Sequence, residues 1–239
     1  MATGTVSDPE DPGREAPENS WATGENPEVK SIYRRLLATH PAMDGHSYNA
    51  AMNGSEVDDL AYQIDSLAAE AAVVPDLVLV QTIDNDMRCD GTDAENLRTF
   101  GKTLDQALSQ IETDLPGARM FLVSPWADVA TWTEWAQHIP AHVSANSGTE
   151  PCDVFDEKGR PRPAGIASMQ AIVDGYLETL ERVCDQHRGC ATDGRALERE
   201  FVPVDADVSL DNNHLSIAGH AKYAAIAWDA LPEEIKSSR

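Results

Sequence analysis

The pair of residues best suited to chemistry is Asp211 and His214, in the stretch Asp-Asn-Asn-His that precedes the last predicted helix. A catalytic histidine needs an acidic partner, which fixes its tautomer and stabilises its charged form. A single turn with the pattern Asp-x-x-His can supply both groups. We therefore interpret the pair as a general base and its orienting acid. The alternative interpretation is a surface turn that leads into a helix cap.

Two polar clusters and one serine are suited to complete such a site. Residues 53–55 (Asn-Gly-Ser) follow a short segment with strand character, and residues 84–86 (Asp-Asn-Asp) directly follow an apolar run. The Gly54 N–H and the Asn85 amide can donate hydrogen bonds to a developing oxyanion. Ser20 lies upstream of these clusters and is the candidate nucleophile. Alternatively, the first cluster is only a turn and the second only ends a strand.

Asp84, Asp86, His214 and His220 also carry groups that bind metals. Their spacings match none of the standard zinc patterns, and the CxxC motif of redox and zinc sites is absent. We therefore expect neither a metal nor a cofactor. A metal-dependent hydrolase is a weaker alternative.

These residues need a scaffold, and the pattern of the chain predicts one. Residues 75–83 and 118–124 are continuous apolar runs, typical of strands that are buried on both faces. Strands alternate with helices along the chain, which predicts a parallel sheet with helices on both faces. Ligands of such folds bind beyond the carboxyl ends of the strands. We expect helices at about 30–40, 57–71, 100–111, 127–137, 166–183 and 216–231, weaker strands at 47–52 and 201–204, and an irregular stretch at 139–163.

Composition excludes several classes of function. The 239 residues include 18 Lys and Arg against 41 Asp and Glu, which gives a formal net charge of −23. Nucleic-acid binding and docking on anionic membranes both need a basic surface, so we expect neither. No apolar run approaches the roughly 18 residues of a membrane span. Residues 1–17 are polar and acidic and predict a disordered tail, whereas residues 18–239 predict a single α/β domain.

The polar clusters together resemble the blocks of the SGNH (GDSL-like) hydrolase family. Asp211-x-x-His214-Leu-Ser-x-x-Gly219-His220 is similar to the family's closing motif, and Asn85-Asp86 is similar to its third block. Asn49-Ala-Ala-x-x-Gly54 resembles the second block, and Ser20-Trp-Ala-Thr-Gly24 resembles the end of the first. The stretch at residues 84–91 and the closing motif resemble a secreted actinobacterial subgroup.

This resemblance implies a fold, a reaction and a set of roles. The fold would be a three-layer sandwich with a flavodoxin-like parallel sheet. Ser20 would be the nucleophile, His214 the general base and Asp211 its orienting acid, and the N–H of Ser20, the N–H of Gly54 and the amide of Asn85 would bind the oxyanion. The chain would hydrolyse small-molecule carboxylic esters with small or medium acyl groups, through an acyl-enzyme and without a metal. Acetylated carbohydrate is one candidate substrate.

The chain departs from the family pattern at two positions. Glu18-Asn19 stands where the family has Gly-Asp before the serine, and no apolar strand precedes Ser20, so the first strand of the sheet is missing from the pattern. Ile83 stands where the third block begins with Gly, and we expect it to extend the strand. The alternative function is therefore a catalytically impaired relative that lacks the strand that positions the nucleophile.

The four cysteines bear on cellular location. They allow three connectivities, and we predict the pairs Cys184–Cys190 and Cys89–Cys152 from their positions in the expected loops. The alternative is four free thiols. Disulfides imply an oxidising compartment, so we expect an extracellular or cell-envelope protein. No signal peptide is visible, which would make the protein cytoplasmic if Met1 is the true start. The oligomeric state is open.

Overall fold

A parallel sheet forms the middle layer of the computed structural model, which describes residues 1–148 and 150–237. In that part of the chain the strands are β1 (Leu77–Gln81), β2 (Arg119–Val123) and β3 (Cys190–Thr192), in the order β1-β2-β3. Leu77 of β1 pairs with Arg119 of β2, and Met120 pairs with Cys190 of β3. Both pairs of strands are parallel, as the sequence predicted.

The apolar sequences of β1 and β2 follow from burial on both faces. Val80 and Leu122 pack into one hydrophobic cluster, whereas Leu79 and Phe121 pack into a second cluster on the opposite face. Side chains alternate between the two faces of a strand, so a sheet that is covered on both sides needs continuous apolar runs. The strands predicted at 75–83 and 118–124 are confirmed.

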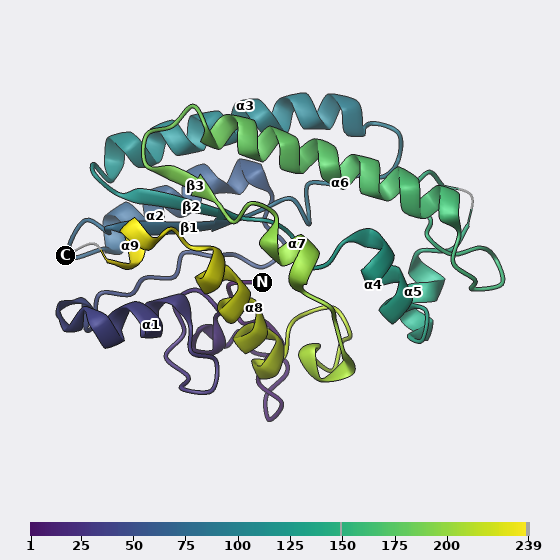
Figure 1. Ribbon diagram of the computed structural model, residues 1–239, viewed down its shortest axis with the longest axis horizontal. Coiled ribbons are helices and arrows are strands. Elements are labelled where there is room, and N and C mark those ends of the chain that lie inside the picture. Colours follow the sequence, from purple (N-terminus) through teal and green to yellow (C-terminus); the bar gives the residue numbers. More distant parts are fainter. Residues whose placement is uncertain (149, 238–239) are drawn as a thin grey trace.

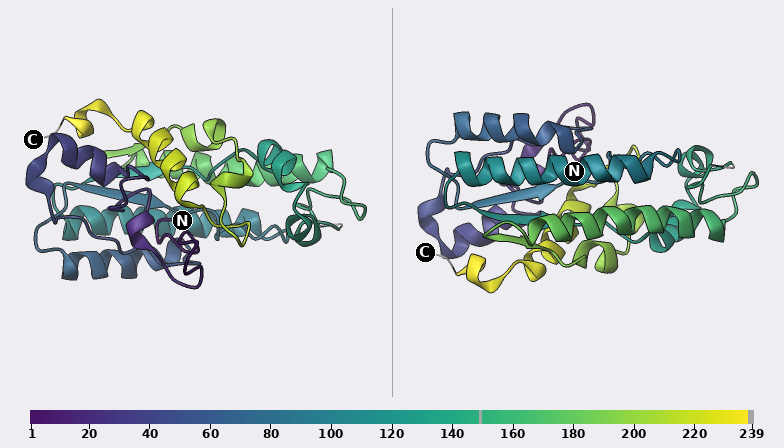
Figure 2. Two further views of the ribbon diagram at one scale, coloured as in Figure 1. Left: turned by 90° about the horizontal axis from the view of Figure 1, so that it is seen from below. Right: turned by 90° about the horizontal axis from the view of Figure 1, so that it is seen from above.

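Helices cover both faces of the sheet, so the chain is a three-layer α/β sandwich (Figure 1). Figure 2 shows α1 (Ile32–Thr39) and α8 (Ile217–Ala230) across the sheet from below, and α2 (Leu60–Glu70), α3 (Asp93–Asp114) and α6 (Pro163–Cys184) across it from above. The upper layer contains α2, α3 and α6. The lower layer contains α1, α8 and α9 (Glu233–Lys236). The shorter helices are α4 (Val129–Ala136), α5 (Pro140–Ala145) and α7 (Ala196–Glu200).

In the described residues, no helix combines the length and apolar character needed to cross a membrane.

Strand β3 was not predicted, because three residues carry too little pattern. Two tertiary features hold it in place. The Cys184–Cys190 disulfide joins the end of α6 to the start of the strand. The buried carboxylate of Asp193, just after the strand, accepts hydrogen bonds from the Ser124 N–H (3.1 Å) and hydroxyl (2.7 Å) at the end of β2.

The weaker strands predicted at 47–52 and 201–204 are wrong, since neither segment forms a strand. Phe201 is buried and packs against Trp126 and Tyr223, whereas Val202 and Val204 are exposed. The apolar residues at 201–204 therefore belong to a loop in which Phe201 is buried and the two valines are exposed. The stretch at 139–163 is irregular apart from α5 and isolated β-bridges, the latter at Ser147, Phe155 and Pro161.

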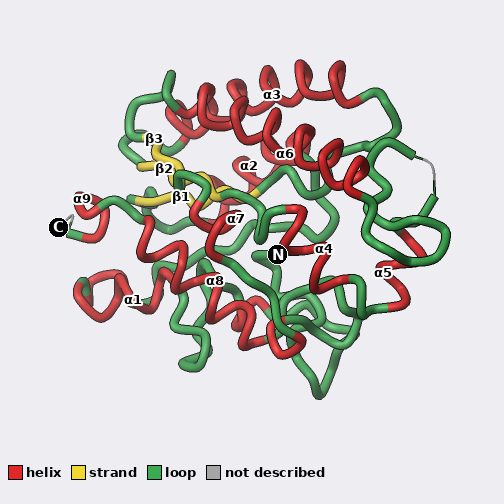
Figure 3. Tube along the Cα trace, turned by 45° about the vertical axis from the view of Figure 1, so that its right-hand side comes forward, coloured by secondary structure: helices red, strands yellow, loops and turns green. Residues whose placement is uncertain are grey.

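Residues 1–17, expected to be a disordered tail, pack partly against the domain. Thr3, Ser7 and Ala16 are buried, and Met1 contacts the lower-layer cluster. Gly4 has a φ of +67°, and a Cβ there would lie 2.0 Å from the Ala16 carbonyl oxygen, so this close approach requires glycine. Polar turn contacts thus replace the apolar burial that the segment lacks. Loops form much of the molecule around the N-terminus (Figure 3).

Candidate active site

Asp211 and His214 form a hydrogen-bonded pair. The Asp211 Oδ2 lies 2.6 Å from His214 Nδ1, and its Oδ1 accepts the backbone N–H groups of Asn213 and His214, each at 3.0 Å. Partial burial opposes ionisation of Asp211, but the hydrogen bonds from His214 and the backbone outweigh it, and the pKa of Asp211 is lowered. The carboxylate is therefore ionised at neutral pH and can stabilise a charged imidazole.

The loop that carries this pair is held at both ends. Ser209 donates from its backbone to the His214 carbonyl (2.7 Å) and from its hydroxyl to the Leu215 carbonyl (2.8 Å). Ser216 caps α8, since its Oγ accepts the Gly219 N–H at 3.1 Å. The helix start and the turn together fix the direction of the His214 ring.

The second nitrogen of His214 faces the Asn53-Gly54 turn. His214 Nε2 lies 3.3 Å from Asn53 Oδ1. With Nδ1–H directed at Asp211, a neutral ring has an acceptor at Nε2, whereas a charged ring donates to the Asn53 oxygen. Gly54 has a φ of +73°, and no atom lies within 4 Å of the position that a Cβ would take. The Asn53-Gly54 turn is thus adjacent to the histidine, and the space beside the Gly54 Cα is open.

Asn85 and Asp86 join the two remaining loops. Asn85 donates from its side chain to the Ser55 carbonyl at 3.0 Å. Asp86 is buried and accepts three hydrogen bonds, from the Val57 N–H (2.9 Å), the Thr82 hydroxyl (2.7 Å) and the Ile83 N–H (2.9 Å). Asp86 is therefore an internal anchor of the loops that face His214, a role that the sequence analysis did not assign.

Ile83 does not extend strand β1, contrary to our expectation. Its φ is +88°, in the left-handed region that favours glycine, and its side chain is completely buried. The Asp86 carboxylate accepts its N–H and so holds this turn. The sequence could have given this signal, because Ile83 occupies the position where the resembled block has Gly.

Ser20 is not joined to the histidine. Its side chain is completely buried, and its Oγ accepts the N–H groups of Ala22 (3.2 Å) and Thr23 (3.4 Å). Its own N–H donates to the Pro17 carbonyl at 3.0 Å. Among the described residues, no hydrogen bond links Ser20 to His214, and no strand precedes it. In this arrangement the hydroxyl and the N–H of Ser20 both stabilise a turn.

His220 packs in the first turns of α8 and is almost completely buried. Burial lowers its pKa to about 3, with smaller contributions from the Met1 ammonium and from His214. His220 is therefore neutral at physiological pH. Among the described residues, no three His, Cys, Asp or Glu side chains are grouped as metal ligands.

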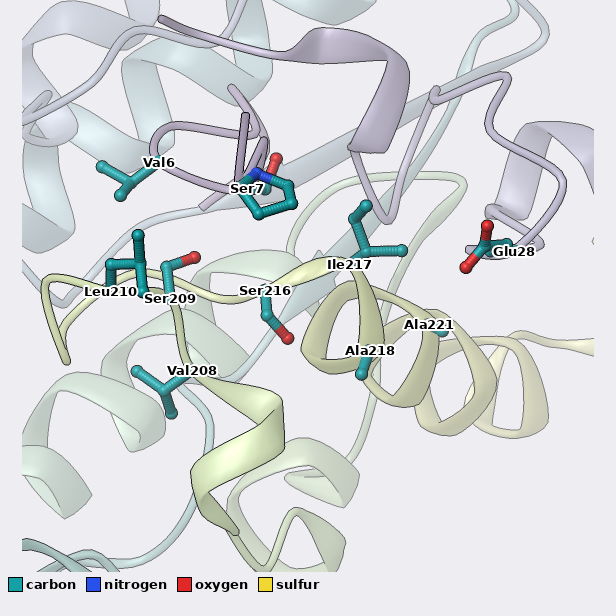
Figure 4. A pocket seen from close by; sticks show the side chains of 11 residues that line it. Val6, Ser7, Glu28, Val208, Ser209, Leu210, Ser216, Ile217, Ala218 and Ala221 are labelled. Carbon is teal, nitrogen blue, oxygen red and sulfur yellow. The ribbon is translucent and has the colours of Figure 1, made fainter. Parts of the chain in front are cut away.

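A pocket of about 380 Å³ flanks the Asp211–His214 loop (Figure 4). Figure 4 shows Val6 and Ser7 on one side, and the segment Val208–Leu210 and the first turn of α8 on the other. Neither Ser20 nor His214 lines it. This pocket is thus a contact between the N-terminal segment and the loop rather than the space in front of the histidine.

Both predicted disulfides are present. The Cα atoms of Cys89 and Cys152 are 5.5 Å apart, and those of Cys184 and Cys190 are 5.4 Å apart. Cys89–Cys152 ties the irregular stretch after α5 to the loop that carries Asn85, so it supports one wall of the candidate site. All four cysteines are paired.

Comparison with known proteins identifies a family for most of the chain. The family model described as GDSL-like Lipase/Acylhydrolase matches residues 19–226. No protein of curated function and no solved structure matches the chain. The matched region includes β1, β2 and β3, helices from both layers and the Asp211–His214 loop. The chain belongs to the GDSL-like lipase/acylhydrolase family.

Proposed function

We propose that this hydrolase cleaves carboxylic esters, with Asp211 and His214 as its acid–base pair. The observation that carries the proposal is the 2.6 Å hydrogen bond between the two side chains, in a loop held at both ends. Small or medium acyl groups are the proposed substrates, with acetylated carbohydrate as one candidate. The net charge of −23 supports a small-molecule substrate over a nucleic acid.

In the proposed reaction, His214 removes a proton from an attacking hydroxyl and returns it to the leaving alcohol. Asp211 orients the ring and stabilises its charged form. The Gly54 N–H and the Asn85 amide would donate to the oxyanion, which requires Asn85 to exchange its bond to Ser55. With Ser20 as nucleophile, the product of the first step is an acyl-serine, which water then hydrolyses.

The role of Ser20 demands a rearrangement. Its hydroxyl must leave the N–H groups of Ala22 and Thr23, and the turn at residues 17–24 must open. A buried turn serine favours the second candidate function, a family member with impaired catalysis whose acid–base pair lacks a nucleophile. Misplacement of a reacting group by about 1 Å already costs roughly 100-fold in rate.

Hydrolysis of p-nitrophenyl acetate by the wild type, Ser20→Ala and His214→Ala separates the candidates. Ser109→Ala, at an exposed position on α3, is the matched control. Loss of about 10²–10⁴-fold in both Ser20→Ala and His214→Ala supports the acyl-enzyme. Loss in His214→Ala alone retains the base and removes Ser20 from the mechanism. Equal rates in all four proteins refute the esterase proposal and support the impaired relative.

We also propose that the protein works outside the cytoplasm. The two disulfides support an oxidising compartment. Counting of reactive thiols in denatured protein from its native source tests this. No reactive thiol is expected, and four would contradict the proposal.

A further inference from the structure

His142 of α5 contacts the loop at residues 209–216, although 70 positions separate it from its partner there. Its Nε2 lies 2.5 Å from the carbonyl oxygen of Asn212, which stands between Asp211 and His214 in the chain. A carbonyl oxygen can only accept a hydrogen bond, so Nε2 carries the proton and His142 is the donor. The reaction proposed above gives this histidine no role.

The peptide group that His142 contacts also supports Asp211. The Asn212 carbonyl and the Asn213 N–H belong to one planar trans peptide, so they point in opposite directions. The Asn213 N–H donates to Asp211 Oδ1 at 3.0 Å. His142 and the Asp211 carboxylate therefore hold the same peptide from opposite sides. A hydrogen bond to the carbonyl also polarises the peptide and strengthens its N–H as a donor.

The backbone of Asn212 makes this support important. Its φ is +57°, in the left-handed region that residues other than glycine adopt uncommonly, although asparagine is enriched there. The Asn212 N–H donates to the Ser209 carbonyl at 2.9 Å and so fixes the amino side of the residue. The contact with His142 fixes its carbonyl side. Rotation on that side would turn the Asn213 N–H away from Asp211.

Aromatic side chains hold the His142 ring in turn. The ring is half-buried, and its centroid lies 5.2 Å from that of Trp132 and 5.5 Å from that of Trp135. The Trp135 indole N–H donates to Asp205 Oδ1 at 3.2 Å, in the segment that leads into the loop. Helices α4 and α5 thus contact residues 205–212 at two points, and the direction of the His142 ring is fixed by packing.

We propose that His142 is a positioning residue for the acid–base pair: its Nε2–H holds the peptide between Asn212 and Asn213, and this peptide holds the Asp211 carboxylate against His214. The consequence for catalysis rests on the proposed function. Because His142 acts through Asp211 rather than on the substrate, its loss should lower kcat and leave KM unchanged.

Two substitutions of similar size separate the hydrogen bond from the packing of the ring. His142→Gln keeps an N–H donor at the end of the side chain, whereas His142→Met has none. Both lose the ring contacts with the two tryptophans, so the difference between them reports the hydrogen bond. His142→Phe keeps a ring without the donor and gives the same test if loss of the ring unfolds α5. His138→Met, at an exposed position after α4, is the control.

The measurements use the full chain. The amide proton resonance of Asn213 reports its bond to Asp211, and hydrolysis of p-nitrophenyl acetate gives kcat and KM. We expect His142→Met to shift the Asn213 resonance and to lower kcat by about tenfold at constant KM. His142→Gln should restore most of both values, and His138→Met should match the wild type.

Equal changes in the glutamine and methionine variants would overturn the proposal. An unchanged Asn213 resonance in His142→Met would do the same, as would an unchanged kcat in an active protein. If the wild type does not hydrolyse the ester, the proposed function fails, and the Asn213 resonance alone then decides whether His142 holds the peptide.

Discussion

The loop at residues 209–216 and the turn at residues 17–24 were both expected to carry catalytic groups, and they differ in how they hold them. In the loop, Asp211 and His214 bond to each other and the backbone of the same turn supports them. In the turn, the Ser20 hydroxyl points into its own backbone and is fully buried. Two side chains from one turn are thus brought together by that turn alone, whereas the expected contact between Ser20 and His214, which joins distant segments, is absent among the described residues.

The largest expected effect is the loss of ester hydrolysis in Asp211→Asn, which tests the loop at residues 209–216. An amide cannot stabilise the charged imidazole and favours the wrong tautomer, so kcat for p-nitrophenyl acetate should fall by about 10²–10⁴-fold. Asp229→Asn, at an exposed position on α8, is the control and should keep the wild-type rate. An unchanged rate in Asp211→Asn would show that the loop is only a structural turn.

Asp86→Ala tests whether the loops facing His214 are held from within. The change leaves the N–H groups of Val57 and Ile83 without their acceptor, and each such loss costs about 1–3 kcal/mol. We expect the free energy of unfolding in urea to fall by about 3 kcal/mol. Asp58→Ala, at an exposed carboxylate beside Val57, should change it by less than about 0.5 kcal/mol. Similar losses in the two variants would remove the anchoring role of Asp86.

Ser20→Ala tests the structural role of the serine in the turn at residues 17–24. The hydroxyl accepts two backbone N–H groups in a turn, and removal of such a cap costs about 1 kcal/mol. The midpoint of urea unfolding should therefore decrease, and Ser109→Ala should leave it unchanged. Unaltered stability together with lost hydrolysis would instead assign Ser20 a reacting role.

The smallest effect concerns the pH dependence of stability. The pKa of Asp211 is lowered in the folded state, so its contribution is present above the unfolded-state pKa and is lost as pH falls through the folded value. Between about pH 5 and pH 2, Asp211→Asn should therefore lose less stability than the wild type. Urea unfolding across this range is the measurement, and parallel curves would contradict the assignment.

Much of the scaffold was predictable from local sequence. The apolar runs predicted β1 and β2, and the spacing of apolar residues predicted α2 and α3, because residues close in sequence share one face of a strand or helix. The start of α8 at Ser216 also depends on neighbouring residues, since its hydroxyl accepts the Gly219 N–H. The predicted cysteine pairs also formed. β3 was missed because its three residues carry too little pattern, and its position depends on pairing with β2 and on the hydrogen bond from the Ser124 hydroxyl to the Asp193 carboxylate, which joins residues far apart in the chain.

The features of the candidate site also differ in whether neighbouring or distant residues determine them. The sequence alone determined the family, the alternation of strands and helices, and the Asp211–His214 pair, because each depends on residues close together in the chain. Only the tertiary structure decided the left-handed turn at Ile83, the burial of Ser20 and the open edge of β1. Those depend on which segments pair across the sheet, and hydrogen bonds and packing between distant residues set that pairing.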